Sequence, residues 1–235
     1  MDDYKRMFEK NRVWAGRMIA ADPEYFARRE FKQEPHTLFV GCSDSRVPTN
    51  ALTQTEPGEL FVHRNIANQI FSSDLNALSV IQYAVDVLDV KHVVVCGHYH
   101  CGGVKAAMTD EHFGLVDYWI GNLRALRDRC KDELDELPNE QACTDRLVEL
   151  NVLQQIYQLT LNSTIRGAWE RGRRPVLHGV VYGLGDGLLH ELITGVDGAD
   201  VARALLPQLG GTLPESPARR KHLGTTAEHA VPAGV

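Results

Sequence analysis

The sequence predicts an α/β fold, in which a single domain has a mainly parallel β-sheet flanked by helices. Short apolar runs, typical of strands buried on both faces, alternate with longer segments that carry apolar residues at helical spacing. A strand, a helix and a second strand in that order connect through a right-handed crossover, which makes the two strands parallel. At 235 residues, the chain has room for one large domain of this kind.

Residues 1–34 are expected to form an N-terminal helical arm that precedes the sheet. Apolar side chains recur every three or four positions from residue 4 to residue 19, which describes one stripe along a helix. Asp22 and Pro23 are typical of a helix cap followed by proline at the first helical position. A second short helix is therefore expected through Tyr25 and Phe26.

Residues 35–209 are expected to form the α/β domain, which carries the candidate functional residues. Strands are predicted from short apolar runs and helices from segments that keep helical spacing. The predicted strands are 37–40, 60–62, 93–95 and 176–177 with 180–182, and the predicted helices are 75–88, 116–129 and 144–161. From Gly210 onward the periodicity is lost, so residues 210–235 are expected to form a flexible C-terminal tail.

Composition argues against several classes of function. Asp and Glu number 31 against 25 Lys and Arg, and the resulting formal charge of -6 argues against a nucleic-acid-binding surface. No apolar run approaches the roughly eighteen residues of a membrane-spanning helix, and the N-terminus lacks the basic and apolar regions of a signal peptide. We therefore expect a cytoplasmic protein that binds neither nucleic acid nor membrane. Its five cysteines are expected to be buried, metal-bound or reactive rather than paired.

Metal-ligating residue types directly follow two of the predicted parallel strands. Cys42 and Asp44 come after the first strand, and His98 and Cys101 come after the third. Loops at the carboxyl ends of neighbouring parallel strands face a common crevice, so these side chains are expected to converge. A single cysteine after a strand is more often a small core residue, but both motifs at strand ends favour a metal. Two thiolates and an imidazole suit zinc and leave a fourth position for water or substrate, unless Asp44 fills it.

Three motifs carry a resemblance to a known family. The three motifs, in the order in which they occur, resemble those of the β-class carbonic anhydrases of the bacterial type. The resemblance spans the chain from about Gln33 to Tyr182. The resemblance implies a lyase with a zinc ion (Zn²⁺) as cofactor, which reversibly hydrates carbon dioxide to bicarbonate and a proton by a zinc-bound hydroxide. The motifs are Cys42-Ser43-Asp44-Ser45-Arg46 with Val47 and Pro48, His63-Arg64-Asn65-Ile66-Ala67-Asn68, and Cys96-Gly97-His98-Tyr99-His100-Cys101-Gly102-Gly103.

The resemblance also assigns roles to individual residues. It implies that Cys42, His98 and Cys101 hold the metal, and that Asp44 either ligates it or forms a catalytic dyad with Arg46. A guanidinium beside Asp44 should keep the carboxylate ionised, so that it accepts the proton of the attacking hydroxide in a hydrogen bond. The family's substrate-pocket positions correspond to Gln33, contributed from the neighbouring subunit, and to Phe61, Tyr83 and Gly102.

Bacterial members also have a regulatory pocket for bicarbonate. This chain resembles them at Val47, Arg64 and Tyr182, but it has Phe39 where they carry tryptophan and Asn50 where they carry an acid. Because two polar partners of that pocket are missing, strong inhibition by bicarbonate is not expected.

The resemblance further implies an assembly of identical subunits. The family's N-terminal helices wrap across a partner, so the arm is expected to pack on a second copy in a homodimer or homotetramer. Two other functions stay open: a carbon disulfide or carbonyl sulfide hydrolase on the same scaffold, and a non-catalytic zinc-binding protein with Asp44 permanently on the metal. The pairing of Asp44 with Arg46 favours a catalytic site over a non-catalytic zinc-binding site. A purely structural zinc site has no use for a guanidinium that draws Asp44 away from the metal.

Overall fold

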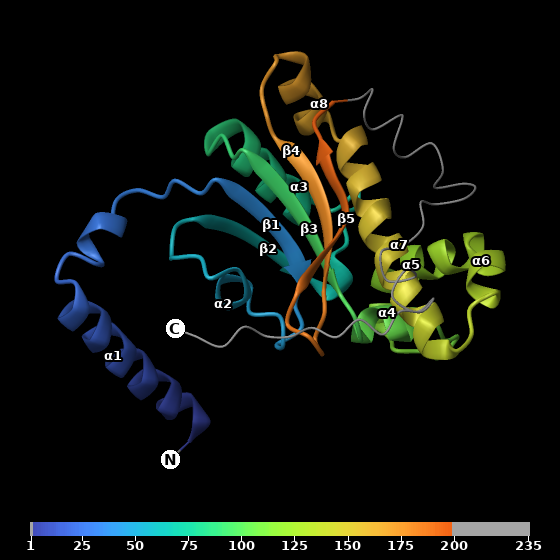
Figure 1. Ribbon diagram of the computed structural model, residues 1–235, viewed down its shortest axis with the longest axis horizontal. Helices are drawn as coiled ribbons and strands as arrows, with labels where there is room; N and C mark the ends of the chain where they lie inside the picture. The colour runs from blue at the N-terminus through green and yellow to red at the C-terminus, as the bar shows by residue number, and fades with distance from the viewer. Residues whose placement is uncertain (1, 199–235) are drawn as a thin grey trace, which may run out of the picture.

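A five-stranded sheet with strand order β2-β1-β3-β4-β5 lies at the centre of the computed structural model, which describes residues 2–198 (Figure 1). The predicted fold class, a single α/β domain with a mainly parallel sheet flanked by helices, is confirmed. The predicted tail at 210–235 lies outside the described residues. The parallel strands are β1 (Thr37–Cys42), β2 (Leu60–Asn65), β3 (His92–His98) and β4 (Val176–Tyr182), and β5 (Leu189–Val196) adds an antiparallel edge.

The register of the central strands positions the two motifs. In β1, Gly41 lies opposite Cys96 of β3, and all strands from β1 to β4 run in the same direction. The carboxyl end of β1 therefore adjoins that of β3, where parallel sheets present their ligand-binding loops.

Helices cover the sheet and connect its strands. The three predicted helices are present, the first continuing through a π-helical turn at Tyr83–Val87. The longest begins four residues before its predicted start, because the Asn139 side chain caps it by accepting the Ala142 amide. The helices of the domain are α2 (Thr49–Thr53), α3 (Leu75–Gln82), α4 (Gly102–Ala107), α5 (Leu115–Arg129), α6 (Lys131–Asp135), α7 (Glu140–Leu161) and α8 (Ser163–Glu170).

The N-terminal arm stands away from the sheet (Figure 1). Its first helix, α1 (Asp3–Ala21), agrees with the predicted stripe, and none of its residues is buried. The prediction of a second short helix through Tyr25 and Phe26 was wrong, because the chain makes a turn there and then one 3-10 turn at Ala27–Arg29. There the ring of Phe26 packs edge-on against Trp14 of α1 at a centroid distance of 5.6 Å, which bends the segment back onto α1.

Helix α7 packs closely on β3 and β4, and two glycines make this possible. A Cβ at Gly97 would lie 2.7 Å from Val152 Cγ2, and a Cβ at Gly179 would lie 2.9 Å from Val152 Cγ1. Any larger residue would hold the helix off the sheet. No helix among the described residues has both the length and the apolar character needed to cross a membrane.

Candidate metal centre

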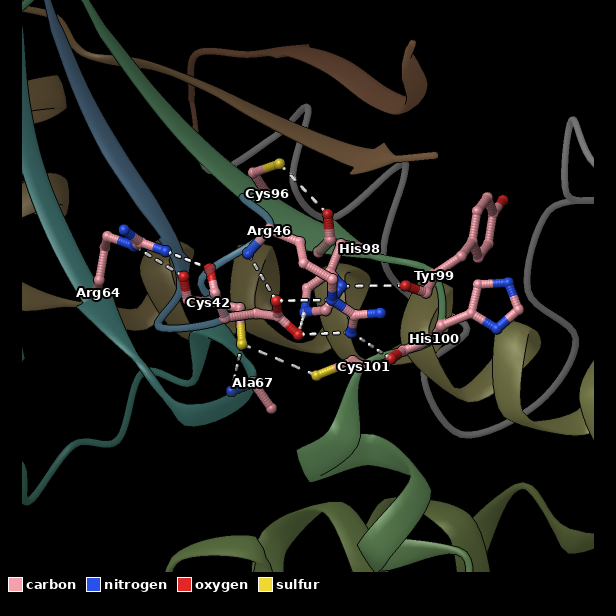
Figure 2. A network of polar contacts seen from close by, with 11 residues as sticks. Cys42, Arg46, Arg64, Ala67, Cys96, His98, Tyr99, His100 and Cys101 are labelled. Atoms are coloured by element: carbon pink, nitrogen blue, oxygen red, sulfur yellow. Dashed lines mark hydrogen bonds and ion pairs between the residues drawn. The ribbon is translucent and has the colours of Figure 1, made fainter. Parts of the chain in front are cut away.

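Side chains from β1, β3 and the turn after β3 meet at one end of the sheet (Figure 2). Cys42 is the last residue of β1, His98 the last of β3, and Cys101 precedes α4. Their ligand atoms all lie within 4.8 Å of one another, and all three residues are buried. The predicted convergence of these three side chains is therefore confirmed.

The geometry of the three donors suits a tetrahedral zinc ion. The Sγ atoms of Cys42 and Cys101 are 3.9 Å apart, close to the ~3.8 Å that two sulfurs at ~2.3 Å from zinc would have in a tetrahedron. His98 Nδ1 donates to the Tyr99 carbonyl at 3.0 Å, which leaves the lone pair of Nε2 free. This Nε2 is buried without a hydrogen-bond partner, an arrangement that a metal ion resolves.

The charge on the two sulfurs also favours metal binding. The pKa of Cys42 is lowered to about 4, because the Cys101 thiol donates to it and the backbone amides of Asp44 and Ala67 add further hydrogen bonds, against the opposing effect of burial. The pKa of Cys101 is raised because its proton is held by the neighbouring Cys42 sulfur. The thiolate is the form that binds zinc, so one sulfur is already charged before metal enters.

Asp44 lies beside these donors but is held by Arg46. The Nε and Nη2 atoms of Arg46 donate to the two carboxylate oxygens at 3.0 and 2.7 Å, and its backbone amide adds a third hydrogen bond at 2.9 Å. These bonds hold the pKa of the Asp44 carboxyl well below its usual range. Asp44 Oδ2 is 3.8 Å from His98 Nε2. Arg46 also donates to the His100 carbonyl at 3.3 Å, so it ties the loop after β1 to the loop after β3.

Comparison with known proteins places this site in a family. Residues 37–189 match the family described as carbonic anhydrase. A carbonic anhydrase of Emericella nidulans is 43% identical over 80% of this chain and 83% of its own. The chain belongs to the β-carbonic anhydrase family. A solved Coccomyxa β-carbonic anhydrase in complex with acetazolamide is 38% identical with a TM-score of 0.84, covering 88% of this chain and 94% of its own. One of two tetrameric β-carbonic anhydrases of Sordaria macrospora is 39% identical with a TM-score of 0.79, and the match covers 83% of this chain and 99% of the Sordaria macrospora chain.

Membership of the β-carbonic anhydrases establishes the chemistry. They are zinc enzymes, and this chain is a carbonic anhydrase that reversibly hydrates carbon dioxide to bicarbonate and a proton. Neither alternative left open by the sequence, the carbon disulfide or carbonyl sulfide hydrolase or the non-catalytic zinc protein, is supported by the relatives.

The residues expected to line the substrate pocket of this β-carbonic anhydrase lie in two places. Gly102 follows Cys101 directly, at the first position of α4. The rings of Phe61 and Tyr83 stack at 5.7 Å, but Phe61 aligns with Leu38 of β1. Leu38 lies four residues before Cys42, or about 13 Å along a strand. Gln33 is exposed and precedes β1, at the end of the strand away from Cys42.

The residues that resemble a bicarbonate pocket are engaged with their own chain. Arg64 donates from Nε to the Cys42 carbonyl at 2.8 Å and from Nη2 to the Asp44 carbonyl at 2.6 Å (Figure 2). Val47 is buried, and Tyr182 packs against a small apolar cluster that contains Phe39. Outside this set, the Asn50 amide donates to Thr55 at 3.2 Å. Weak inhibition by bicarbonate stays a prediction.

Buried polar side chains of α7 reach the site, and the sequence analysis missed them. The hydroxyl of Tyr99 donates to Glu149 at 3.0 Å, and Asn151 donates to the Ala67 carbonyl at 2.8 Å. Glu149 and Asn151 are 2% and 1% exposed. The sequence does hold a signal for them. Polar residues that interrupt the apolar positions of a helix expected to be buried must find hydrogen-bond partners inside the protein.

Proposed function

We propose that this carbonic anhydrase works with an open zinc site, in which Cys42, His98 and Cys101 are the protein ligands and the fourth position is left to water. The pairing of Asp44 with Arg46 carries this proposal, because three hydrogen bonds hold the carboxylate on the arginine. Zinc bound to these donors supplies a Lewis acid, which lowers the pKa of a coordinated water and makes a nucleophile available near neutral pH.

Asp44 orients the nucleophile in this proposal. Its low pKa keeps the carboxylate ionised, and therefore an acceptor, at every pH near neutrality. Oδ2 faces the metal donors and accepts the proton of the attacking group in a hydrogen bond, which directs a lone pair toward carbon dioxide. The Gly102 amide, which has no partner within its helix, donates to a substrate oxygen.

A second copy of the chain completes the pocket. Gln33 precedes β1, and Phe61, on which Tyr83 stacks, lies level with Leu38. All three therefore lie away from the Cys42 end of the sheet and would reach the metal site of a neighbouring subunit. Two observations support an assembly: α1 exposes apolar side chains, including Tyr4 and Phe8, and the similar Sordaria macrospora enzymes are tetrameric. The enzyme is thus a homodimer or homotetramer, with its arm packed on a partner.

The surroundings of the enzyme follow from its thiols. All five cysteines are free, and metal-binding thiolates persist where glutathione keeps thiols reduced. We place the enzyme in the cytoplasm, free of membrane and nucleic acid.

The Asp44→Asn variant tests the open site. It is expected to retain zinc by metal analysis, yet to lose hydration activity by about 10²- to 10³-fold in stopped-flow assays with a pH indicator. Asp89→Asn is the matched control, because Asp89 pairs with Arg173 at 2.6 Å on the surface, and full activity is expected. Full activity in Asp44→Asn would remove the role of the carboxylate. Turnover of carbon disulfide by the wild type without hydration of carbon dioxide would overturn the substrate.

A further inference from the structure

A strained turn lies directly against the metal centre. The turn Ile66–Asn68, here called the Ala67 turn, holds two successive residues in the left-handed region, with φ of 60° at Ala67 and 47° at Asn68. L-residues adopt this region at a cost in free energy and do so only when their surroundings impose it. Something outside the turn must therefore hold it.

Two buried side-chain amides of α7 hold the Ala67 turn and the chain just after it. Asn151 Nδ2 donates to the Ala67 carbonyl at 2.8 Å, and Gln155 Oε1 accepts the Ile70 amide at 2.8 Å. The two side chains are themselves joined, since Gln155 Nε2 donates to Asn151 Oδ1 at 2.7 Å. Asn151 is 1% and Gln155 4% exposed, so water does not compete for these bonds.

The Ala67 turn presents its backbone N–H to a metal ligand. The Ala67 amide donates to Cys42 Sγ at 3.4 Å, as the dashed line in Figure 2 shows. On its other side, the turn packs on the segment that follows Cys101, where a Cβ at Gly103 would lie 2.7 Å from Ile66 Cγ2 and 3.3 Å from the Ala67 Cβ. The turn is therefore confined between the two cysteine-bearing loops.

We infer that Asn151 is a positioning residue for the zinc site, because it fixes the Ala67 peptide so that its N–H stays on the Cys42 sulfur. A hydrogen bond to a thiolate withdraws charge from the sulfur and leaves less of it for the metal. Zinc carried by two thiolates thus stays a stronger Lewis acid than the ligands alone would make it. The inference rests on the proposed role of Cys42 as a ligand.

The test uses the full-length Asn151→Ala protein loaded with zinc or with cobalt(II). Zinc affinity, measured by competition with a chelator, is expected to fall by about tenfold, at the lower end of what outer-shell changes cause, because the Ala67 turn no longer confines the Cys42 sulfur and the thiolate loses a hydrogen bond that favours its charged form. The sulfur-to-cobalt charge-transfer band is expected to move to longer wavelength, because the Cys42 thiolate becomes richer in electrons. Thr160→Val is the matched control: Thr160 is buried in the same helix and donates to the Tyr157 carbonyl at 2.7 Å. Neither affinity nor band should change in it.

The outcomes separate the inference from the proposal beneath it. If Cys42→Ala binds zinc as tightly as the wild type, the ligand assignment is overturned and the inference with it. If Cys42→Ala loses zinc while Asn151→Ala keeps wild-type affinity and an unmoved band, the inference alone is overturned. Should Asn151→Ala fail to fold, Gln155→Ala serves instead, because it removes the hydrogen bond that Gln155 donates to Asn151. The sulfur-to-cobalt band of this variant is expected to move to longer wavelength as well. An unmoved band would likewise overturn the inference.

Discussion

Gly97→Ala is expected to destabilise the enzyme and weaken its zinc site from a position that holds no metal. Gly97 lies in β3 beneath α7 and immediately before His98. A Cβ there would lie 2.7 Å from Val152 Cγ2 and 3.1 Å from Val148 Cγ1. Carbon atoms in ordinary contact are about 3.5–4.0 Å apart, so the new methyl group overlaps Val152 by roughly 1 Å.

Val152 has no room to relieve this overlap. It is fully buried, a valine in a helix has essentially one rotamer, and its other methyl already lies against Gly179 of β4, so close that a Cβ there would be only 2.9 Å away. Helix α7 must therefore lift from the sheet, and overpacking of this kind costs about 1–3 kcal/mol. In a domain of this size, each kcal/mol lowers the melting temperature by about 2–4 °C. Because α7 also carries Asn151, zinc affinity should fall as well.

Thermal unfolding of the metal-free and zinc-loaded forms at one protein concentration measures the first effect, and chelator competition measures the second. Gly121→Ala is the matched control, because a Cβ at Gly121 of α5 would meet nothing within 4 Å. Alanine is favoured over glycine inside a helix by up to about 1 kcal/mol, so this variant should be as stable as the wild type or more so. An unchanged melting temperature and zinc affinity in Gly97→Ala would refute the close packing of α7 on β3.

Two further predictions concern Asp44 and a histidine pair. Arg46→Ala is expected to free Asp44 to take the fourth coordination position, so that a crystal structure at neutral pH shows four protein ligands and hydration slows; an unmoved carboxylate with an undiminished rate would contradict this. Burial lowers the pKa of both His92 and His178, whose ring nitrogens lie 3.1 Å apart. Protonation therefore favours the unfolded chain, so the stability they contribute is present above the unfolded pKa of 6.5 and is lost as pH falls below it. Between about pH 7.5 and 5.5, the urea midpoint of the wild type should drop more than that of His178→Gln, and equal drops would count against the pairing.

The parallel strands and the three metal donors could be predicted because both depend on local pattern and order. Apolar runs followed by Cys42 and by His98 predict strand ends, and parallel strands bring such ends together whatever the details of packing. Strand β5 was not predicted, since its buried and exposed positions do not alternate regularly and its pairing with β4 shifts register. The short helices α2, α4 and α6 are five or six residues long, too short for helical periodicity to indicate.

By itself, the sequence determined the fold class, the family and the identity of the Cys42, His98 and Cys101 donors, because these follow from residue types at fixed positions relative to strand ends. Only the tertiary structure decided that Asp44 rests on Arg46 and that Asn151 holds the peptide facing Cys42. The first pairing leaves Asp44 off the metal position, a choice between two arrangements that the sequence left open. The second joins residues 84 positions apart and depends on how closely α7 settles on the sheet, which is a property of packing rather than of any local pattern.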